Sequence, residues 1–541
     1  MKMTGAQAMV KALELEGIKT IFGYPGAAIC PFYDALLGSN ITHVLTRNEQ
    51  GAAHSASGYA RVTGKPGVCV ATSGPGATNL ITGIATAYMD SIPMVAITGQ
   101  VALELIGRDV FQEVDITGAT APFCKHNYLV KNVQELPRII KEAFHIASTG
   151  RPGPVLIDVP VDIQMQELDF IYPSNVEIKG YKPNYKGHPQ QIRKIADAIS
   201  QAKAPVICAG GGVITAKATD IMTSLVEKCG IPVVTTLMGI GAIAGDHPLN
   251  LGMLGSHGVY AANYAVNRTD LLILIGARVG DRALGTAKKI AERAKIIHID
   301  IDPAEIGKNV STTIPVVGDA RLILEELCNI IQPGDTFDWV SEVKRVKQEM
   351  LKSEQCINRD FINPKLVISF LSERLKDTSI MATEVGQNQI WAANNFVAKR
   401  PGAFITSGGL GTMGYGLPAA IGAKLGSPDS TVVVVGGDGS FQMSMPELGT
   451  IKQCGIGIKI LILNNSRLGM VREIQKTRYN KRYSQVFMDN NPDFVKLAEA
   501  YGFRAERVTT HSQISAALDR FLADDDTYLL ECVIDPEEST I

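Results

Sequence analysis

The sequence lacks long apolar runs, paired cysteines and an excess of charge of one sign. No stretch reaches the roughly 18 consecutive apolar residues that a membrane-spanning helix needs. The 52 Lys and Arg residues almost balance the 54 Asp and Glu residues, so the formal net charge is −2. This balance argues against a protein that follows a nucleic-acid backbone and against a polybasic membrane anchor. We therefore expect no nucleic acid and no membrane among the partners.

The nine cysteines are scattered, and no two of them form a Cys-x-x-Cys pair. Such a set is typical of free thiols in a reducing compartment, and not of a disulfide framework or a zinc site. The first 17 residues include Lys2, Lys11, Glu14 and Glu16 and contain no uninterrupted apolar segment, unlike a secretion signal. These features predict a cytoplasmic protein.

Glycine is the residue in excess, with 52 among 541 residues against an average of about 7%. Proline, with 26 residues, is not in excess, so the glycines do not indicate collagen or a flexible linker. They indicate many tight backbone passages. Hydrophobic residues make up 45% of the chain, which excludes intrinsic disorder as the main state.

Short apolar runs alternate with longer helix-like segments along nearly the whole chain. Runs such as 271–275, 432–435 and 459–463 are apolar without alternation, as expected of parallel strands that are covered on both faces. The fold class predicted from this rhythm is α/β, with doubly wound parallel sheets. Polar or charged stretches at 164–189 and 321–360 divide the chain into three units. The predicted domains are 1–165, 190–325 and 362–541.

The strongest motif lies in the third unit. Gly437, Asp438, Gly439 and Ser440 follow one apolar run, and 24 residues later Asn464 and Asn465 close the next run. Both groups are therefore expected at the carboxyl ends of parallel strands, where open α/β sheets bind ligands. The Asp438 carboxylate, the Asn465 amide oxygen and a main-chain carbonyl near Arg467 suit Mg²⁺ bound to a diphosphate. Taken alone, Gly-Asp-Gly is also compatible with a tight strand–helix turn and a capping aspartate.

The spacing of these residues resembles the thiamine diphosphate (ThDP) signature. Enzymes of this type need a glutamate that is hydrogen-bonded to the pyrimidine ring of the cofactor. Glu49, in the run Arg47-Asn48-Glu49-Gln50-Gly51, follows the predicted strand 43–45 and begins a helix. A glutamate in a first helical turn, favoured by the helix dipole, is the alternative interpretation.

More specifically, the chain resembles the large catalytic subunit of acetohydroxyacid synthase (acetolactate synthase). The matching runs are spread over all three units. They are Phe22–Gly26, Thr72–Asn79, Phe111–Glu113, Arg151–Pro154, Gly276–Arg278 and Thr406–Gly422.

This resemblance implies decarboxylation of pyruvate and transfer of the two-carbon unit to a second 2-ketoacid, in the synthesis of valine, leucine and isoleucine. The product is 2-acetolactate, or 2-aceto-2-hydroxybutyrate when 2-ketobutyrate is the acceptor. It also implies a pyruvate-decarboxylase-like fold with a pyrimidine-binding, a flavin-binding-like and a diphosphate-binding domain. The implied cofactors are ThDP, Mg²⁺ and FAD without a redox role. A homodimer or dimer of dimers, with active sites between subunits, and a small regulatory subunit are the implied partners.

The resemblance assigns roles to residues in all three units. The catalytic group comprises Glu49, Gln112, Phe111, Gly26 and Arg282, of which Arg282 is suited to an acceptor carboxylate. The residues assigned to ThDP are Pro25, Thr72, Gly76, Asn79, Gln387, Asn388, Gly411, Met413, Gly437, Gly439, Ser440 and Met470. Those assigned to FAD are Arg151, Gly211, Gly212, His257, Gly276, Arg278, Asp300 and Asp319. The metal ligands are Asp438, Asn465 and the carbonyl near Arg467.

Several positions depart from the family pattern. Asn388 replaces a histidine, and Ile474 replaces a tryptophan that is associated with 2-ketobutyrate, which favours pyruvate as the acceptor. Gly280 replaces an aspartate near the flavin. The proline-rich tail of most relatives is absent, so we expect a more open active site.

Other functions fit the sequence less well. A pyruvate oxidase-like enzyme with ThDP and FAD is one alternative, and a catabolic acetolactate synthase that feeds acetoin formation is another. A scaffold that only binds cofactors would not need Glu49. A Rossmann dehydrogenase is disfavoured because no Gly-x-Gly-x-x-Gly follows the first predicted strand with an acidic residue about 20 positions on.

Overall fold

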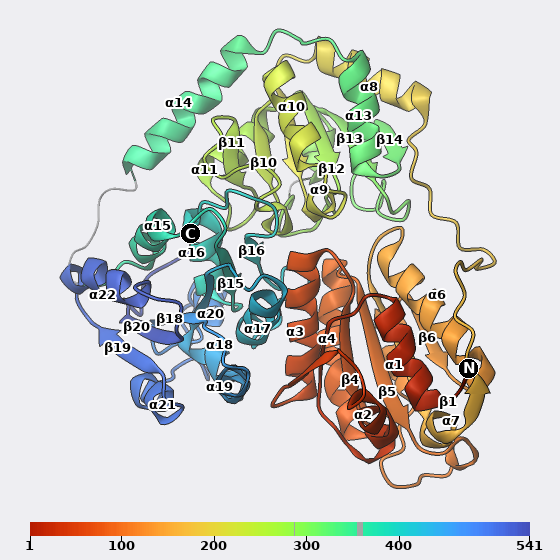
Figure 1. Cartoon of the computed structure of the whole chain (residues 1–541). Helices are drawn as coiled ribbons and strands as arrows, with labels where there is room; N and C mark the ends of the chain where they lie inside the picture. Colours follow the sequence, from red (N-terminus) through yellow and green to blue (C-terminus); the bar gives the residue numbers. More distant parts are fainter. Residues whose placement is uncertain (286, 354–360, 541) are drawn as a thin grey trace.

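The computed structural model describes residues 1–285, 287–353 and 361–540, which form three six-stranded sheets (Figure 1). Within each of these sheets, every strand pairs in parallel with its neighbours. The predicted α/β class with three parallel-sheet domains is therefore confirmed. A short antiparallel pair, β1 (Lys2–Thr4) with β8 (Glu167–Asp169), lies outside the three sheets.

The first sheet has helices on both faces. α3 (Glu49–Thr63) and α4 (Pro75–Asp90) cover one face, and α1 (Gly5–Leu15), α2 (Cys30–Leu36) and α6 (Leu136–Ser148) cover the other. From edge to edge the strands are β3 (Thr42–Leu45), β2 (Thr20–Gly23), β4 (Gly67–Ala71), β5 (Met94–Gln100), β7 (Pro154–Pro160) and β6 (His126–Leu129).

The middle sheet is built in the same way. α8 (Pro189–Gln201), α10 (Thr219–Cys229) and α13 (Ala320–Ile330) pack on one face, and α11 (Tyr260–Arg268) and α14 (Phe337–Ser353) pack on the other. Its strands are β11 (Asn250–Met253), β10 (Val233–Thr235), β9 (Pro205–Ala209), β12 (Leu271–Ile275), β13 (Lys295–Asp300) and β14 (Ile314–Val317).

The third sheet lies between two further helical layers. α17 (Gly416–Gly426), α19 (Leu448–Cys454) and α21 (Phe494–Ala500) cover one face, and α15 (Pro364–Arg374), α16 (Gln387–Asn395) and α22 (Ile514–Phe521) cover the other. Its strands are β16 (Phe404–Ile405), β15 (Ile380–Thr383), β17 (Val432–Gly437), β18 (Lys459–Asn464), β20 (Tyr528–Val533) and β19 (Arg504–Val508). α18 (Asp438–Gln442) and α20 (Gly469–Arg478) follow β17 and β18.

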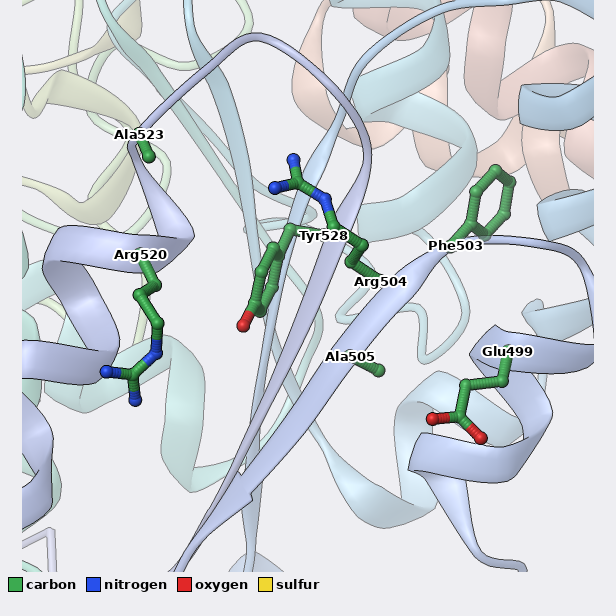
Figure 2. Close-up of a pocket in the computed structure, with 7 residues that line it drawn as sticks. All are labelled: Glu499, Phe503, Arg504, Ala505, Arg520, Ala523 and Tyr528. Carbon is green, nitrogen blue, oxygen red and sulfur yellow. The ribbon is translucent and has the colours of Figure 1, made fainter.

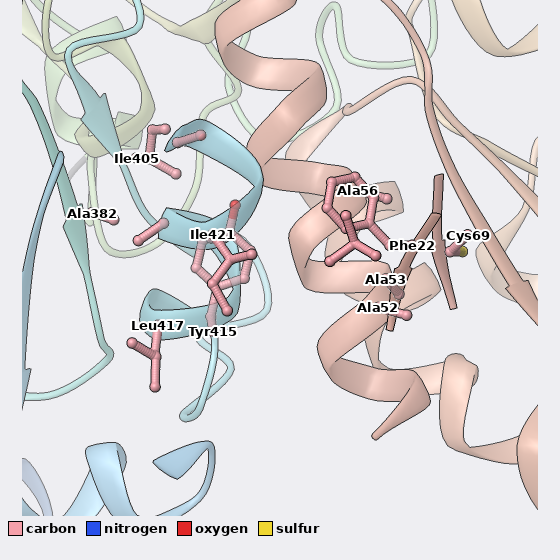
Figure 3. Packing of buried hydrophobic residues seen from close by; sticks show 14 of the residues in the cluster. Phe22, Ala52, Ala53, Ala56, Cys69, Ala382, Ile405, Tyr415, Leu417 and Ile421 are labelled. Carbon is pink, nitrogen blue, oxygen red and sulfur yellow. The ribbon is translucent and has the colours of Figure 1, made fainter. Parts of the chain in front are cut away.

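The first and third domains share one continuous hydrophobic core, in which α3 packs directly on α17 (Figure 3). Two glycines allow this close approach. A Cβ atom on Gly58 would lie 2.0 Å from the Ala419 carbonyl oxygen, and one on Gly422 would lie 1.8 Å from the Ser55 carbonyl oxygen. The two helices therefore touch backbone to backbone, which fixes the two domains relative to each other.

The predicted strand 43–45 and the apolar runs 271–275, 432–435 and 459–463 all coincide with observed strands. Several strands were not predicted, among them β6, β14, β16 and β19, which lie at sheet edges and are short or partly exposed. Across the described ranges, none of the helices combines the length and apolar character needed to cross a bilayer.

The glycine contact between α3 and α17 can be tested by Gly422→Ala. The added methyl group must displace the Ser55 carbonyl, and overpacking of this kind costs about 1–3 kcal/mol of stability. We expect a lower midpoint of thermal unfolding, measured by circular dichroism. Gly38→Ala is the matched control, because the nearest atom to its added Cβ is 3.9 Å away. Equal midpoints for the two variants would contradict the packing argument.

Candidate active site

The predicted residues of the first domain meet at the carboxyl edge of its sheet. Gly26 follows β2, Thr72 follows β4, and the Thr72 hydroxyl accepts a hydrogen bond of 3.1 Å from the Ala28 amide. A Cβ atom on Gly26 would lie 2.4 Å from the Thr72 methyl carbon. One on Gly76 would lie 2.8 Å from the same methyl carbon and 3.3 Å from Glu49 Oε1. The fold thus brings Gly26, Thr72, Gly76 and Glu49 side by side, with Pro25 adjacent to Gly26.

Glu49 is the first residue of α3, after the N-cap residue Asn48. Its Oε2 accepts a hydrogen bond of 2.9 Å from Asn79 Nδ2 on α4. Among the described residues, no cation forms an ion pair with this carboxylate. Asn79 thus engages Oε2, and Oε1 lies near the Cβ position of Gly76.

The loop between β5 and α5 (Ile116–Thr120) carries Phe111 and Gln112. Gln112 has a φ of +60°, a conformation that a residue with a Cβ atom adopts at a cost, and its Cα packs against Gly74. The Glu113 carboxylate accepts backbone hydrogen bonds from Gly107, Arg108 and Val110, so the loop is closed on itself. The Phe111 ring points away from the protein and is 86% exposed within the single chain.

In the third domain, Asp438 begins α18 directly after β17 and is only 1% exposed. Its partner is a neutral amide: Asn491 Nδ2 donates to Asp438 Oδ2 at 2.7 Å. Burial raises the pKa of the Asp438 carboxyl to about 6, although the hydrogen bond from Asn491 opposes this shift. A buried carboxylate without a cationic partner is a suitable ligand for a divalent cation.

Asn465 lies beside Asp438, as the strand order of β17 and β18 requires. Its Nδ2 donates to Gln387 Oε1 at 2.9 Å, and its Oδ1 accepts from the Arg467 amide at 3.1 Å. The Arg467 side chain turns outward and pairs with Asp489. Gly439 packs against Leu468, just before Gly469 and Met470 on α20. The predicted residues after β15, β17 and β18 are thus brought together at one edge.

A loop from Gly408 to Gly416 carries two further predicted residues, Gly411 and Met413. Gly411 has a φ of +71°, and a Cβ atom there would meet nothing closer than Val385 at 4.0 Å. Met413 is half-buried. This part of the loop therefore has space beside its backbone, unlike most of the glycine-rich turns.

Two polar residues of this edge were not predicted from the sequence. Asn491 holds Asp438 and is itself held by Gln442 Nε2 at 2.9 Å. Glu473 accepts hydrogen bonds from Gln387 Nε2 at 2.6 Å and from the Thr540 amide at 2.8 Å. Both come from segments far along the chain, and no spacing rule connects them to the Gly-Asp-Gly motif.

The predicted flavin residues of the middle domain are only partly brought together. Gly212 donates to the Gly276 carbonyl at 3.0 Å, and the backbone of Gly276 fills the space beside Gly210 and Gly212. These glycines, unlike Gly211, allow two strand–helix turns to pack against each other. His257 lies apart from them, where its Nδ1 meets the hydroxyl of Thr540 at 3.1 Å.

Several charged residues predicted for the flavin already have partners in the protein. Arg151 pairs with Asp302 at 3.1 Å and with Glu305 at 2.9 Å, across the boundary between the first and middle domains. Asp319 caps the amino end of α13. Asp300 is the last residue of β13 and accepts a hydrogen bond from the Asp302 amide. Arg278 is half-buried, and the Arg282 side chain is 72% exposed.

A hollow of about 510 Å³ on the third domain is not part of this arrangement (Figure 2). Arg504 and Tyr528, which line it, are the first residues of β19 and β20, so the hollow lies at the amino ends of the strands. Its cations already have partners, since Arg504 pairs with Asp524 and Arg520 with Glu506. The site residues gather at the opposite edge of the sheet.

Comparison with known proteins matches all three domains. Residues 3–119, 192–327 and 384–532 match the N-terminal TPP binding domain, the central domain and the C-terminal TPP binding domain of thiamine pyrophosphate enzymes. A probable acetolactate synthase large subunit of Methanocaldococcus jannaschii is 50% identical, over 99% of this chain and 93% of the relative. The acetolactate synthase isozyme 2 large subunit of Escherichia coli is 46% identical, over 99% and 96%.

This chain belongs to the acetolactate synthase large-subunit family. The acetolactate synthase large subunit of Corynebacterium glutamicum is a third relative, with 47% identity over 96% of this chain and 84% of the relative. The predicted family is therefore confirmed, as is the presence of ThDP-binding domains at both ends of the chain.

Asn388, which departs from the histidine of the family pattern, has a structural role here. Its Nδ2 donates to the carbonyls of Glu384 at 2.9 Å and Val435 at 3.0 Å, and thereby ties β15 to β17. Because both donors are used, its Oδ1 is the atom that faces Gly386 and Gly437. An acceptor oxygen cannot donate to a phosphate, so in this orientation the Asn388 side chain does not supply a hydrogen bond to the diphosphate.

Asn388→Leu separates these two roles. Loss of both donors leaves two buried carbonyls without this partner, which costs about 1–3 kcal/mol of stability. We expect a lower unfolding midpoint and, for the folded protein, little change in the dissociation constant of ThDP. Asn395→Leu, at a half-buried amide that donates to the Trp391 carbonyl of its own helix, is the control. A weaker ThDP affinity at unchanged stability would assign Asn388 to the cofactor instead.

Proposed function

We propose that this chain catalyses the ThDP-dependent decarboxylation of pyruvate and joins the two-carbon unit to a second 2-ketoacid. The product is 2-acetolactate, an intermediate of valine, leucine and isoleucine synthesis. The observation that carries the proposal is a pair of carboxylates, one in each ThDP-binding domain, that are placed to act on a cofactor. Glu49 faces Thr72 and Gly76 in the first domain, and Asp438 lies buried without a cationic partner in the third.

The donors in the third domain fit a hydrated Mg²⁺ ion. This cation prefers carboxylate, amide and main-chain oxygens and binds through few protein ligands. Asp438 Oδ1 and Asn465 Oδ1 lie at the ends of adjacent strands, and the carbonyl of Arg467 follows two residues after Asn465. The ion would neutralise the buried carboxylate and hold the diphosphate next to Gly437, Gly439 and Ser440.

When bound, ThDP supplies a nucleophilic carbon that adds to the carbonyl of a 2-ketoacid and stabilises the negative charge left by CO₂. Glu49 Oε2 is engaged by Asn79, so Oε1 is the atom that would hold the proton exchanged with the pyrimidine ring. Met413 would fill the space between the two rings, for which a flexible thioether is suited. Gln387 and Met470 would border the same space.

The two halves of this site come from different subunits in our proposal. Within the described parts of the chain, no hydrogen bond joins Glu49 to Asp438, Asn465 or Gln387. A homodimer in which Glu49 faces the third domain of the partner subunit completes the site and covers the exposed Phe111. Assembly into a dimer of dimers, a small regulatory subunit and a cytoplasmic location complete the proposal.

Domains 1–165, 190–325 and 362–541 would bind the pyrimidine, FAD and the diphosphate, respectively. For FAD, Gly211 and Arg278 are available as they stand. Gly276 is packed against Gly212 and His257 contacts Thr540, while Arg151 and Asp319 would have to leave their present partners. We propose that the flavin has no redox role. Gln112 would line the substrate position, and the exposed Arg282 would bind the carboxylate of the acceptor. Ile474, which is 39% exposed, leaves room without an aromatic wall and favours pyruvate.

Glu49→Gln tests the catalytic assignment. The amide keeps the shape of the side chain but cannot take up a proton, and general acid–base catalysis is worth about 10²–10⁴-fold in rate. We expect acetolactate formation, followed colorimetrically with FAD and Mg²⁺ present, to fall by at least 100-fold while ThDP still binds. Glu167→Gln, at an exposed residue of β8, is the control. Turnover at the wild-type rate in Glu49→Gln would refute the assignment.

Asn491→Ala tests the metal site. Removal of the amide that orients Asp438 should weaken Mg²⁺ binding by about tenfold or more, as for other residues that hold a metal ligand. The measurement is an Mg²⁺ titration of ThDP binding, followed by tryptophan fluorescence. The control is Asn490→Ala, at the exposed neighbouring residue. If both variants need the same Mg²⁺ concentration to bind ThDP, Asn491 does not support Mg²⁺ binding by Asp438.

A further inference from the structure

The loop from Gly408 to Gly416 is held by two buried carboxylates, one at each end. Asp90, at the end of α4 in the first domain, accepts from the amides of Gly408 at 3.3 Å and Gly409 at 2.7 Å. Glu384, in the third domain, accepts from the amides of Gly414 at 2.7 Å and Leu417 at 3.1 Å. The residues Gly411 and Met413 therefore lie between the two anchored ends.

The two carboxylates differ in the charge of their partners. Asp90 forms an ion pair of 2.6 Å with Arg61, whose guanidinium also lies over the Tyr415 ring. Glu384 is fully buried, and its partners among the described residues are amides and the hydroxyl of Ser444, at 3.3 Å. Burial raises the pKa of the Glu384 carboxyl to about 7, against the effect of these donors. Burial of a carboxylate costs free energy unless hydrogen-bond donors compensate for the lost water. Here the donors are main-chain amides that themselves need an acceptor.

The donors that Glu384 satisfies belong to the start of α17. The first amides of a helix have no partner within the helix, and the N-cap residue Tyr415 supplies no side-chain hydrogen bond to them. Glu384 reaches them from the end of β15, where its own amide donates to the Val435 carbonyl at 2.9 Å. The carboxylate thus connects the strand edge that carries Asp438 to the loop that carries Met413.

We propose that Glu384 is a positioning residue, which fixes the Gly414–Leu417 backbone and thereby holds Gly411 and Met413 against the bound cofactor. Its carboxylate acts through backbone amides and touches neither cofactor nor substrate. The inference rests on the proposed function, because the position of Met413 matters only if ThDP binds between the pyrimidine-binding and diphosphate-binding domains. Replacement of the carboxylate should therefore change cofactor binding more than it changes substrate binding.

Glu384→Gln is the decisive variant. The amide group has nearly the same volume but turns an NH₂ group toward amide donors, so at least one hydrogen bond to a charged acceptor is lost. We expect the dissociation constant of ThDP to rise by about tenfold to a hundredfold. It is measured with saturating Mg²⁺ by quenching of tryptophan fluorescence, since Trp391 lies on α16, which begins at Gln387. At saturating ThDP, kcat should fall while KM for pyruvate stays unchanged.

A matched control separates positioning from stability. Glu142 is also a buried carboxylate, 8% exposed, and is bonded to Tyr128 and Arg138 on the far face of the first sheet. Glu142→Gln should lower the unfolding midpoint and leave ThDP affinity and kcat unchanged. Glu384→Asp, one methylene shorter but still an acceptor, should lie between the wild type and Glu384→Gln in ThDP affinity.

The possible results distinguish the inference from the proposed function. If the wild type does not bind ThDP, the proposed function fails. If the wild type binds ThDP and Glu384→Gln binds it equally tightly with an unchanged kcat, Glu384 has only a structural role and the inference is wrong. If Glu384→Gln does not fold, Glu384→Asp decides, because an unchanged ThDP affinity in that variant overturns the inference as well.

Discussion

The backbone contact between α3 and α17 is the constraint on which the rest of the site depends. Gly58 and Gly422 let the two helices meet at main-chain distance, so the first and third sheets share one core. α3 begins at Glu49, and α17 begins directly after the loop that carries Met413. Because interiors are close-packed, a shift at this contact would move Glu49 relative to Met413, and these two residues of one chain contribute to different sites in the proposed homodimer. The packing of these two helices thus fixes how the catalytic residues of one chain are placed relative to each other.

Buried carboxylates connect the domains around this contact. Asp90 holds Gly409, and Glu447 accepts from the Arg47 amide at 2.9 Å, two residues before Glu49. Both bonds join the first domain to the third, and both use a carboxylate to satisfy a main-chain donor. Hydrogen bonds to charged acceptors are stronger than neutral ones, and their loss leaves a buried charge. These hydrogen bonds fix the loops at Gly409 and Arg47, next to the residues proposed to contact the cofactor.

The sequence allowed prediction of the sheets and of the edge at which each motif lies. Doubly covered strands such as β17 and β18 are continuously apolar, and their order places Asp438 beside Asn465. Residues held by tertiary contact could not be predicted in this way. Asn491 reaches Asp438 across 53 positions, and Glu384 reaches Leu417 across 33, without periodicity or a fixed spacing. The effect of Asn388 in place of a histidine likewise depends on a side-chain orientation that only the fold determines.

The glycines have different physical roles, and two of these roles concern the site. At Gly58, Gly212 and Gly422 the missing Cβ is replaced by the backbone of a neighbouring element, so these glycines serve packing and leave no space for a ligand. At Gly411 the backbone has a positive φ and its nearest neighbour is 4.0 Å from a Cβ position. Because Asp90 and Glu384 hold the loop on either side of Gly411, the loop does not move in to fill this space. Gly411 therefore keeps open space on a fixed backbone, two residues before Met413, where the proposed cofactor would lie.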